Sequence, residues 1–203
     1  TSLGLKEFYL HGHSWGTALA LEYYLKYPKG IKAIIFNSPY FSTSLWKADA
    51  DTLITTLPDS IQLAIKTGEK NHDYGSPAYK NANEVFYKNF GVRKTKLTSE
   101  LDTSTAKGNE FIYNYMWGPT EFTAAGTLIN YNRVQSLKTI KVPTLFITGE
   151  FDEARPVTVK YFQSLVPNSK FVMIDGAGHG TMHDNKGQNI SAVKTFLDSL
   201  ELK

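Results

Sequence analysis

The sequence predicts an α/β protein in which a parallel sheet, flanked by helices, is interrupted by a helical insertion. Three observations support this prediction. A strand, a serine set between two glycines and a helix follow one another near the start of the chain. Strand-like and helical segments alternate again after residue 141, whereas residues 40–140 carry few strand signals and look mostly helical. We therefore predict a core made of residues 1–39 and 141–203, with a helical cap at 40–140.

The first of these observations is the segment Gly-His-Ser-Trp-Gly at residues 12–16, between an apolar run at 8–10 and a helix-forming stretch at 17–25. A serine in this setting is typical of a nucleophile elbow, a tight strand-to-helix turn that strains the serine backbone and exposes its hydroxyl. Both glycines are expected because larger side chains would collide in such a turn. The N–H of Trp15 would lie at a helix N-terminus, which favours negative charge, so we predict that it donates to an oxyanion.

The remaining elements follow from apolar periodicity and from the positions of glycine and proline. Residues 31–36 form an apolar run that predicts a buried strand, and a crossover of this length implies that it is parallel to the first. The polar stretch 95–108 is predicted to be a loop. Further strands are predicted at 143–149 and 170–174, and helices at 43–57, 60–67, 78–90, 110–116, 157–166 and 188–200.

Composition narrows the class of protein. The chain has 203 residues, of which 41% are hydrophobic and 20% charged, as in globular proteins. The net charge of +3 is small and the lysines are scattered, so we predict no nucleic-acid partner. No apolar run reaches membrane-spanning length. The lack of cysteine excludes disulfides and thiolate chemistry but fixes no compartment. No metal-binding or phosphate-binding motif is found, so we predict no cofactor and no metal. We also predict a cytoplasmic location.

A serine nucleophile needs a base to take its proton and a carboxylate to orient that base. In parallel sheets such groups gather at the carboxyl ends of the strands. Asp152 follows the predicted strand at 143–149, and His179 follows the one at 170–174 between two glycines. We therefore predict that Ser14, His179 and Asp152 act as nucleophile, base and acid.

Several other residues compete for these roles. For the acid, the alternatives are Glu150, Asp175 and Asp184. For the base, the competitor is His183, which lies farther into the segment that follows. His11 and His13 lie beside the elbow, where they are predicted to pack or to line a pocket.

These motifs together resemble the α/β-hydrolase superfamily, in which serine, acid and histidine follow in this chain order. The resemblance is carried by Gly12-His13-Ser14-Trp15-Gly16, Gly149-Glu150-Phe151-Asp152-Glu153 with Pro156, and Gly176-Ala177-Gly178-His179. Residues 116–122, Met-Trp-Gly-Pro-Thr-Glu-Phe, with Gly126-Thr127-Leu128, are similar to the cap motif of the proline iminopeptidase family. The resemblance covers most of the chain. It implies an α/β-hydrolase fold and a serine exopeptidase that removes proline, or another N-terminal residue, from short peptides or amino-acid amides.

The resemblance also implies that Glu121 and Glu153 bind the free amino group of the substrate. Buried negative charge is what an aminopeptidase needs to pair with an ammonium group and to reject blocked N-termini. The chain departs from the family at Thr17, where a second glycine is usual. No HGGPG-type oxyanion loop precedes the elbow. We therefore expect the chain to be part of a longer protein, with an open sheet edge through which two copies could pair.

Two alternative functions follow from the same residues. An esterase or acylhydrolase would carry the same elbow and triad, although the cap motif favours the aminopeptidase. A truncated chain without the oxyanion loop would be inactive, because losing one oxyanion donor costs about a hundredfold to a thousandfold in rate.

Overall fold

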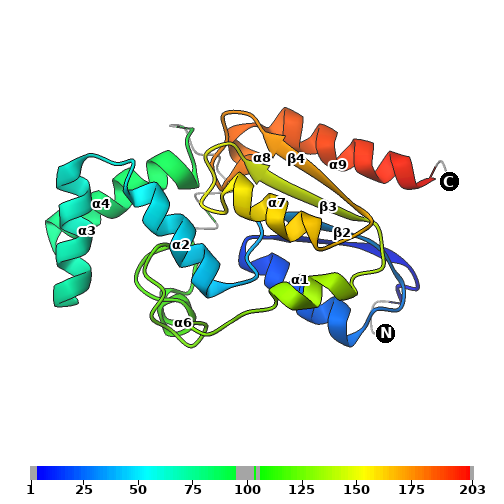
Figure 1. Ribbon diagram of the computed structural model, residues 1–203, viewed down its shortest axis with the longest axis horizontal. Helices are drawn as coiled ribbons and strands as arrows, with labels where there is room; N and C mark the ends of the chain where they lie inside the picture. The colour runs from blue at the N-terminus through cyan, green and yellow to red at the C-terminus, as the bar shows by residue number, and fades with distance from the viewer. Residues whose placement is uncertain (1–3, 95–102, 104–105, 202–203) are drawn as a thin grey trace.

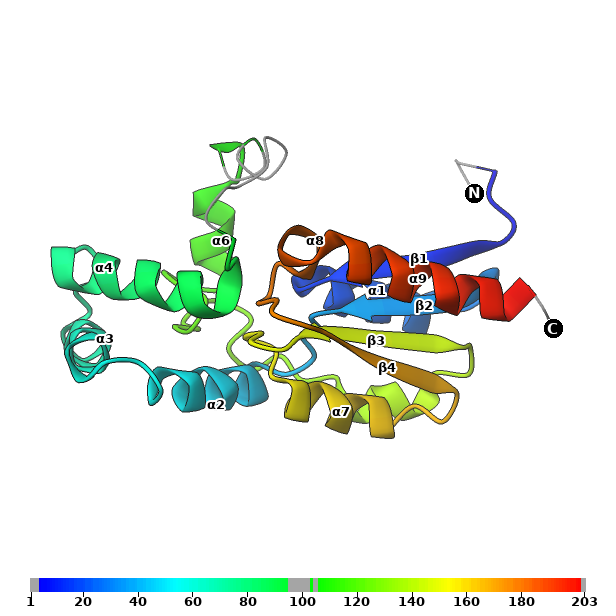
Figure 2. The same cartoon turned by 90° about the horizontal axis from the view of Figure 1, so that it is seen from above.

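The computed structural model describes residues 4–94, 103 and 106–201, and its centre is a four-stranded parallel sheet. The strands β1 (Phe8–His13), β2 (Ile31–Asn37), β3 (Thr144–Gly149) and β4 (Ser169–Ile174) lie in that order across the sheet. Helices pack on both faces of the sheet (Figures 1 and 2). The predicted α/β class with a flanked parallel sheet is confirmed. Among the described strands, β1 pairs only with β2 and forms one edge.

The two central strands bury side chains on both faces. Ile34 and Phe36 of β2 point into the cluster formed with α1 (Trp15–Lys26) and α7 (Pro156–Ser164). Ala33 and Ile35 point the other way, into the cluster formed with α9 (Lys186–Glu201). All four are at most 2% exposed, and burial of each larger side chain contributes about 2 kcal/mol. The continuous apolar runs in the sequence are explained by this two-sided burial.

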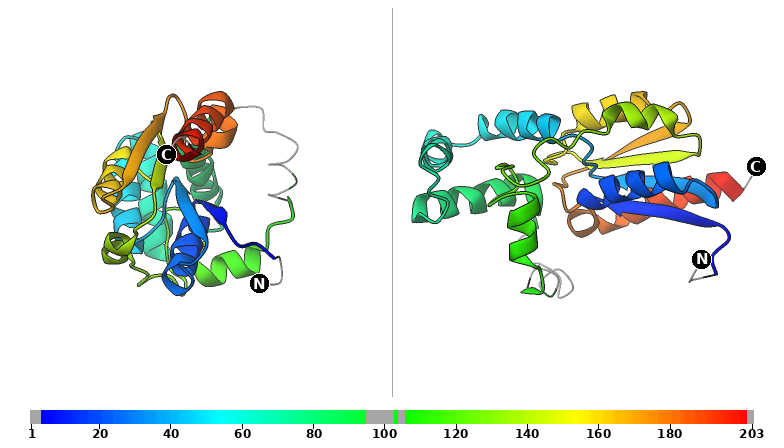
Figure 3. Two further views of the ribbon diagram at one scale, coloured as in Figure 1. Left: turned by 90° about the vertical axis from the view of Figure 1, so that its right-hand side faces the viewer. Right: turned by 90° about the horizontal axis from the view of Figure 1, so that it is seen from below.

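A group of helices extends beyond the carboxyl ends of the strands (Figures 2 and 3). These helices have an apolar cluster of their own, built mainly from α2, α3 and α4, in which Tyr79 and Phe86 are at most 1% exposed. We refer to them as the cap: α2 (Thr43–Ile54), α3 (Asp59–Asn71), α4 (Pro77–Phe86), the π-helix η1 (Tyr87–Gly91) and α6 (Glu110–Met116). The 3-10 helix η2 (Val134–Thr139) packs its buried Val134 and Leu137 into the α1 and α7 cluster beside the sheet.

All of the predicted helices exist, with differences at their ends. The helix predicted at 78–90 ends at Phe86 as an α-helix and continues as the π-helix η1. The short helix α8 (Thr181–Asp184) and η2 are additional to the prediction. Most of the loop predicted at 95–108 lies outside the described residues. None of the helices in the described part of the chain combines the length and the apolar character needed to cross a membrane.

The elbow between β1 and α1 has the strained geometry that the sequence predicts. Ser14 has φ 54° and ψ −129°, a conformation that residues with a side chain rarely adopt. Its N–H donates to the carbonyl oxygen of Asn37 on β2 at 3.0 Å, which fixes the turn to the sheet. A Cβ atom on Gly12 would collide with the backbone of Gly16 and Thr17. A Cβ atom on Gly16 would meet no described atom within 4 Å apart from its chain neighbours and the backbone of its own helix, so the expectation that both glycines are sterically required is right only for Gly12.

Gly12→Ala is therefore expected to destabilise the fold by about 3 kcal/mol, because the added methyl group meets backbone that cannot rotate away. Gly16→Ala is the matched control, and it should change stability by less than about 1 kcal/mol, since it lies in the first turn of α1 with open space beside it. Urea unfolding of both variants measures the difference. Equal stability of the two variants would contradict this account of the elbow.

Candidate active site

The loops that follow β3 and β4 meet at a buried carboxylate–imidazole pair. His179 Nδ1 lies 2.8 Å from Asp152 Oδ1, and the two residues are 8% and 0% exposed. The carboxyl ends of adjacent parallel strands lie at the same edge of the sheet, which is why residues 27 positions apart come together here. The imidazole that bonds to Asp152 is therefore that of His179. The competing His183 lies on the helix α8 that follows the loop.

The Asp152 carboxylate accepts hydrogen bonds on both oxygens. Oδ2 accepts from the hydroxyls of Ser38 at 2.6 Å and Thr148 at 3.1 Å, and from the N–H of Gly149 at 3.0 Å. Oδ1 accepts from the N–H of Ala154 at 2.8 Å in addition to the imidazole. Burial alone would raise the pKa of Asp152, but the charge of the imidazole and these hydrogen bonds lower it below its usual value. The side chain is therefore a fixed anion at neutral pH.

Ser38 is a site residue that the sequence analysis missed. It follows β2 with φ 50°, is fully buried, and places its hydroxyl 2.6 Å from Asp152 and 3.1 Å from the carbonyl oxygen of His179. Its N–H donates to Ile147 O on β3 at 2.8 Å, so strand pairing sets its position. The only signal in the sequence is a hydroxyl residue directly after the carboxyl end of a central strand.

The other nitrogen of His179 is available for proton transfer. Nε2 is buried and has no hydrogen-bond partner among the described residues. Burial alone would lower the pKa of His179, but the carboxylate of Asp152, supported by Glu153 and Glu121, raises it to about 9. The imidazole is thus held close to three acidic side chains that stabilise its protonated form.

His13 connects the elbow to the loop of His179. Its Nε2–H donates to the carbonyl oxygen of His179 at 2.9 Å, and the two ring centroids are 4.8 Å apart. Burial, together with the nearby charge of His179, lowers the pKa of His13 to about 4. His13 is therefore neutral and packs beside Ser14. This contact brings the elbow and the predicted base to the same place.

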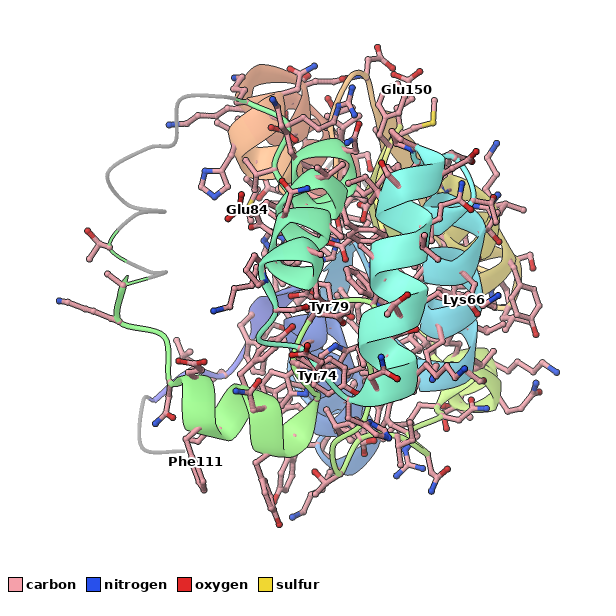
Figure 4. The ribbon with its side chains drawn as sticks, turned by 90° about the vertical axis from the view of Figure 1, so that its left-hand side faces the viewer. Lys66, Tyr74, Tyr79, Glu84, Phe111 and Glu150 are labelled. Atoms are coloured by element: carbon pink, nitrogen blue, oxygen red, sulfur yellow. The ribbon has the colours of Figure 1, made fainter. Side chains whose placement is uncertain are left out.

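Ser14 lies on the wall of a cavity of about 560 Å³ between the elbow and the cap. Aromatic side chains form much of this wall, including Trp15, Tyr40 and Trp46. Trp15 is the first residue of α1, where a backbone N–H has no partner within the helix, which suits an oxyanion donor. Helix α6 adds further lining residues, whereas its Phe111 points away from the body of the molecule (Figure 4).

Two glutamates, Glu121 in the cap and Glu153 beside Asp152, lie close enough for their charges to interact. Glu153 is 2% exposed, and neither of its carboxylate oxygens has a hydrogen-bond partner among the described residues. Burial, and then the charge of Glu121, raise the pKa of Glu153 well above its usual value. Burial, and then the charges of Glu121 and Glu153, raise the pKa of Tyr87 to about 12. A buried carboxylate without a partner is costly, so this cluster has the chemistry of a site for a cationic group.

The cap motif holds Glu121 in place through its backbone. The indole N–H of Trp46 donates to the carbonyl oxygen of Glu121 at 2.9 Å, and the indole N–H of Trp117 donates to that of Thr120 at 2.9 Å. Gly118 has φ 149°, and a Cβ atom there would collide with the backbone of Thr123. The motif is therefore a tight turn that presents the Glu121 side chain to the cavity.

Comparison with known sequences relates the chain to α/β hydrolases and to proline iminopeptidases. Residues 1–186 match the family described as alpha/beta hydrolase fold. The chain is 38% identical to the proline iminopeptidase of Heyndrickxia coagulans over 200 residues, which cover 98% of this chain and 69% of that protein. It is 33% identical to the proline iminopeptidase of Lactobacillus helveticus (strain DPC 4571), over 97% of this chain and 67% of that protein.

Two solved structures superpose closely on nearly the whole chain. The proline iminopeptidase of Mycobacterium smegmatis superposes with a TM-score of 0.91 and 28% identity, over 99% of this chain and 68% of that one. VinJ superposes with a TM-score of 0.92 and 26% identity, over 98% of this chain and 68% of that one. The similarity includes the cap as well as the sheet, since nearly the whole chain is covered.

Proposed function

Because the chain belongs to the proline iminopeptidase family of the α/β hydrolases, we propose that it releases proline, or another N-terminal residue, from short peptides and amino-acid amides with Ser14, His179 and Asp152 as its triad. The observation that carries the proposal is the buried carboxylate of Glu153, which has no hydrogen-bond partner in the described part of the chain and lies one residue from the acid that orients the base. A triad alone would serve any acyl transfer, whereas this carboxylate calls for a substrate with a positive charge next to the scissile bond.

In the proposed mechanism, Ser14 Oγ attacks the carbonyl carbon of the first residue while His179 Nε2 takes its proton. Asp152 holds the proton on Nδ1 and stabilises the imidazolium that forms. The backbone N–H of Trp15 donates to the developing oxyanion. His179 then gives its proton to the leaving amine. A water molecule, deprotonated by the same imidazole, hydrolyses the acyl-enzyme and restores Ser14.

Specificity follows from two features of the site, the interacting carboxylates of Glu121 and Glu153 and the aromatic wall of the cavity. The ammonium group of the substrate would pair with Glu153 and Glu121, which replaces the repulsion between two carboxylates by attraction to a cation. The aromatic wall would receive the side chain of the first residue. An N-acylated substrate has no positive charge and would leave the buried carboxylate of Glu153 without a cation, so it should be rejected.

The test is a comparison of prolyl p-nitroanilide with its N-acetyl derivative, using the protein as it occurs naturally. We expect kcat/KM for the free amine to be higher by at least about a thousandfold, as for sites built around a polar group of the substrate. Equal hydrolysis of the two anilides would contradict the proposal. A neutral p-nitrophenyl ester, assayed alongside, identifies an esterase if it is hydrolysed while neither anilide is. Labelling of Ser14 by a serine-reactive phosphonate identifies an active chain.

A further inference from the structure

We propose that Asp184 is a positioning residue for the base, because its carboxylate joins the loop of His179 to the segment that follows the π-helix η1 of the cap. The proposal rests on the role given to His179 under the proposed function. It concerns two segments: the base loop, residues 176–180, and the strap, residues 87–94, which consists of η1 and the three residues after it.

The base loop is bound to the strap by backbone hydrogen bonds. The N–H of His179 donates to Phe90 O at 2.7 Å, and the N–H of Gly180 donates to Gly91 O at 2.9 Å. Both carbonyls belong to the last two residues of η1, where no further helical turn takes them. A Cβ atom on Gly178 would come within 2.6 Å of Gly91 O, so the glycine permits this close approach. The π-helix η1 of the cap thus holds the backbone of His179 directly.

Asp184 closes the same junction from the other side. One carboxylate oxygen accepts from the N–H of Arg93 at 2.9 Å and from that of Lys94 at 2.8 Å. The other oxygen accepts from the N–H of Gly178 at 2.9 Å. Hydrogen bonds to a charged acceptor are stronger than neutral ones. The carboxylate therefore joins the strap and the base loop through three backbone groups.

The Arg93 side chain extends this junction to the loop of the acid. Its Nε–H donates to Gly176 O at 3.1 Å, and Nη1–H donates to Asn89 O at 2.6 Å. Its guanidinium lies 3.9 Å from the ring centroid of Phe151, whose own N–H donates to Ala177 O at 2.9 Å. Because Phe151 precedes Asp152, the strap contacts both loops whose side chains form the carboxylate–imidazole pair.

The strap also contributes to the glutamate cluster. Tyr87, its first residue, lies close enough to Glu121 and Glu153 for their charges to affect its hydroxyl, and its ring covers Gly91. A shift of η1 would therefore move both the surroundings of the substrate ammonium and the support of the base. Asp184 holds this segment at the end nearest His179. Its loss should disturb the orientation of the imidazole more than the binding of substrate.

The experiment compares two variants, Asp184→Ala and Asp184→Asn, with the control Asp175→Asn. The control also removes a charge beside the base loop, but the Asp175 carboxylate bonds to Gln188 and not to the strap. We expect kcat for the prolyl anilide to fall about a hundredfold for Asp184→Ala, the usual cost of a misplaced catalytic group, with KM unchanged within twofold. Asp184→Asn keeps one acceptor oxygen and should recover part of the loss. Rates are expressed per active site titrated with phosphonate.

Proton NMR gives a readout that does not depend on turnover. The low-field resonance of the His179 Nδ1 proton, bonded to Asp152, should broaden or shift in Asp184→Ala and remain unchanged in Asp175→Asn. Asp184→Asn carries the test if the alanine variant does not fold. A wild-type kcat and resonance in folded Asp184 variants, with only a lower Tm, would overturn the proposal. An inactive wild-type protein would refute the proposed function, while the resonance would still test Asp184.

Discussion

Asp152→Asn is expected to lower kcat for prolyl p-nitroanilide about ten-thousandfold, with KM changed by no more than about threefold. The reason is the number of donors around the side chain. Two hydroxyls and two backbone N–H groups point at its oxygens, in addition to the imidazole. An amide can present only one oxygen, so its NH₂ group must face donors and leave them unsatisfied. The imidazole of His179 then either loses its hydrogen bond to residue 152 or adopts the wrong tautomer.

The matched control for this substitution is Glu150→Gln, two residues earlier in the same loop. The Glu150 carboxylate is exposed and accepts one hydrogen bond, from the N–H of Gly176 at 2.9 Å. We expect kcat within about twofold of the wild-type value. Steady-state kinetics of both variants with the prolyl anilide measure the difference. A large loss in Glu150→Gln together with a small one in Asp152→Asn would assign the acid to Glu150.

The parts of the fold that could be predicted from sequence are those with local causes. The elbow requires a strand, a serine and a glycine that admits the backbone of the next turn, and these lie within a few residues of one another. The two central strands, β2 and β3, are mostly apolar runs because helices cover both of their faces. The order of strands and the position of polar residues after each then bring Asp152 and His179 to one edge.

The residues that sequence analysis missed depend on pairings distant in the chain. Ser38 contacts Asp152, 114 positions away, only because β2 lies beside β3. Asp184 was considered as an acid, yet its carboxylate accepts the N–H of Arg93, 91 positions away. The π-helix η1 was predicted as the end of an ordinary helix, since helix propensity does not distinguish the two hydrogen-bond registers.

Glu153→Gln is expected to lower kcat/KM for prolyl p-nitroanilide about a hundredfold to a thousandfold, the usual cost of removing one partner of a buried charge pair. The substitution keeps the size of the side chain and removes its charge. The attraction to the substrate ammonium is large here because Glu153 is 2% exposed and poorly screened by water. Glu84→Gln, on the exposed surface of α4 (Figure 4), is the control and should leave kcat/KM unchanged.

A neutral ester should respond to Glu153→Gln in the opposite direction. The imidazole accepts the proton of Ser14 only when it is neutral. Against the effect of burial, Asp152, and then Glu153 in its ionised form, raise the pKa of His179 to about 9. Removing the carboxylate of Glu153 lowers the pKa of His179, so a larger fraction of the base is neutral at pH 7. The rise of kcat/KM with pH, measured with p-nitrophenyl acetate, should therefore move to lower pH in the variant, and ester hydrolysis at pH 7 should increase.

These opposite effects of Glu153→Gln on the anilide and the ester separate binding of the ammonium group from support of the triad. If Glu153 served only to hold the loop of Asp152, its loss would reduce hydrolysis of the anilide and of the ester by the same factor. Opposite changes require that the carboxylate acts on the two substrates through its charge. Because ammonium binding and the pKa of His179 depend on the same carboxylate, a bound substrate amine should lower the pKa of the base. The acidic limb of kcat for the prolyl anilide should then lie below that of kcat/KM for the ester.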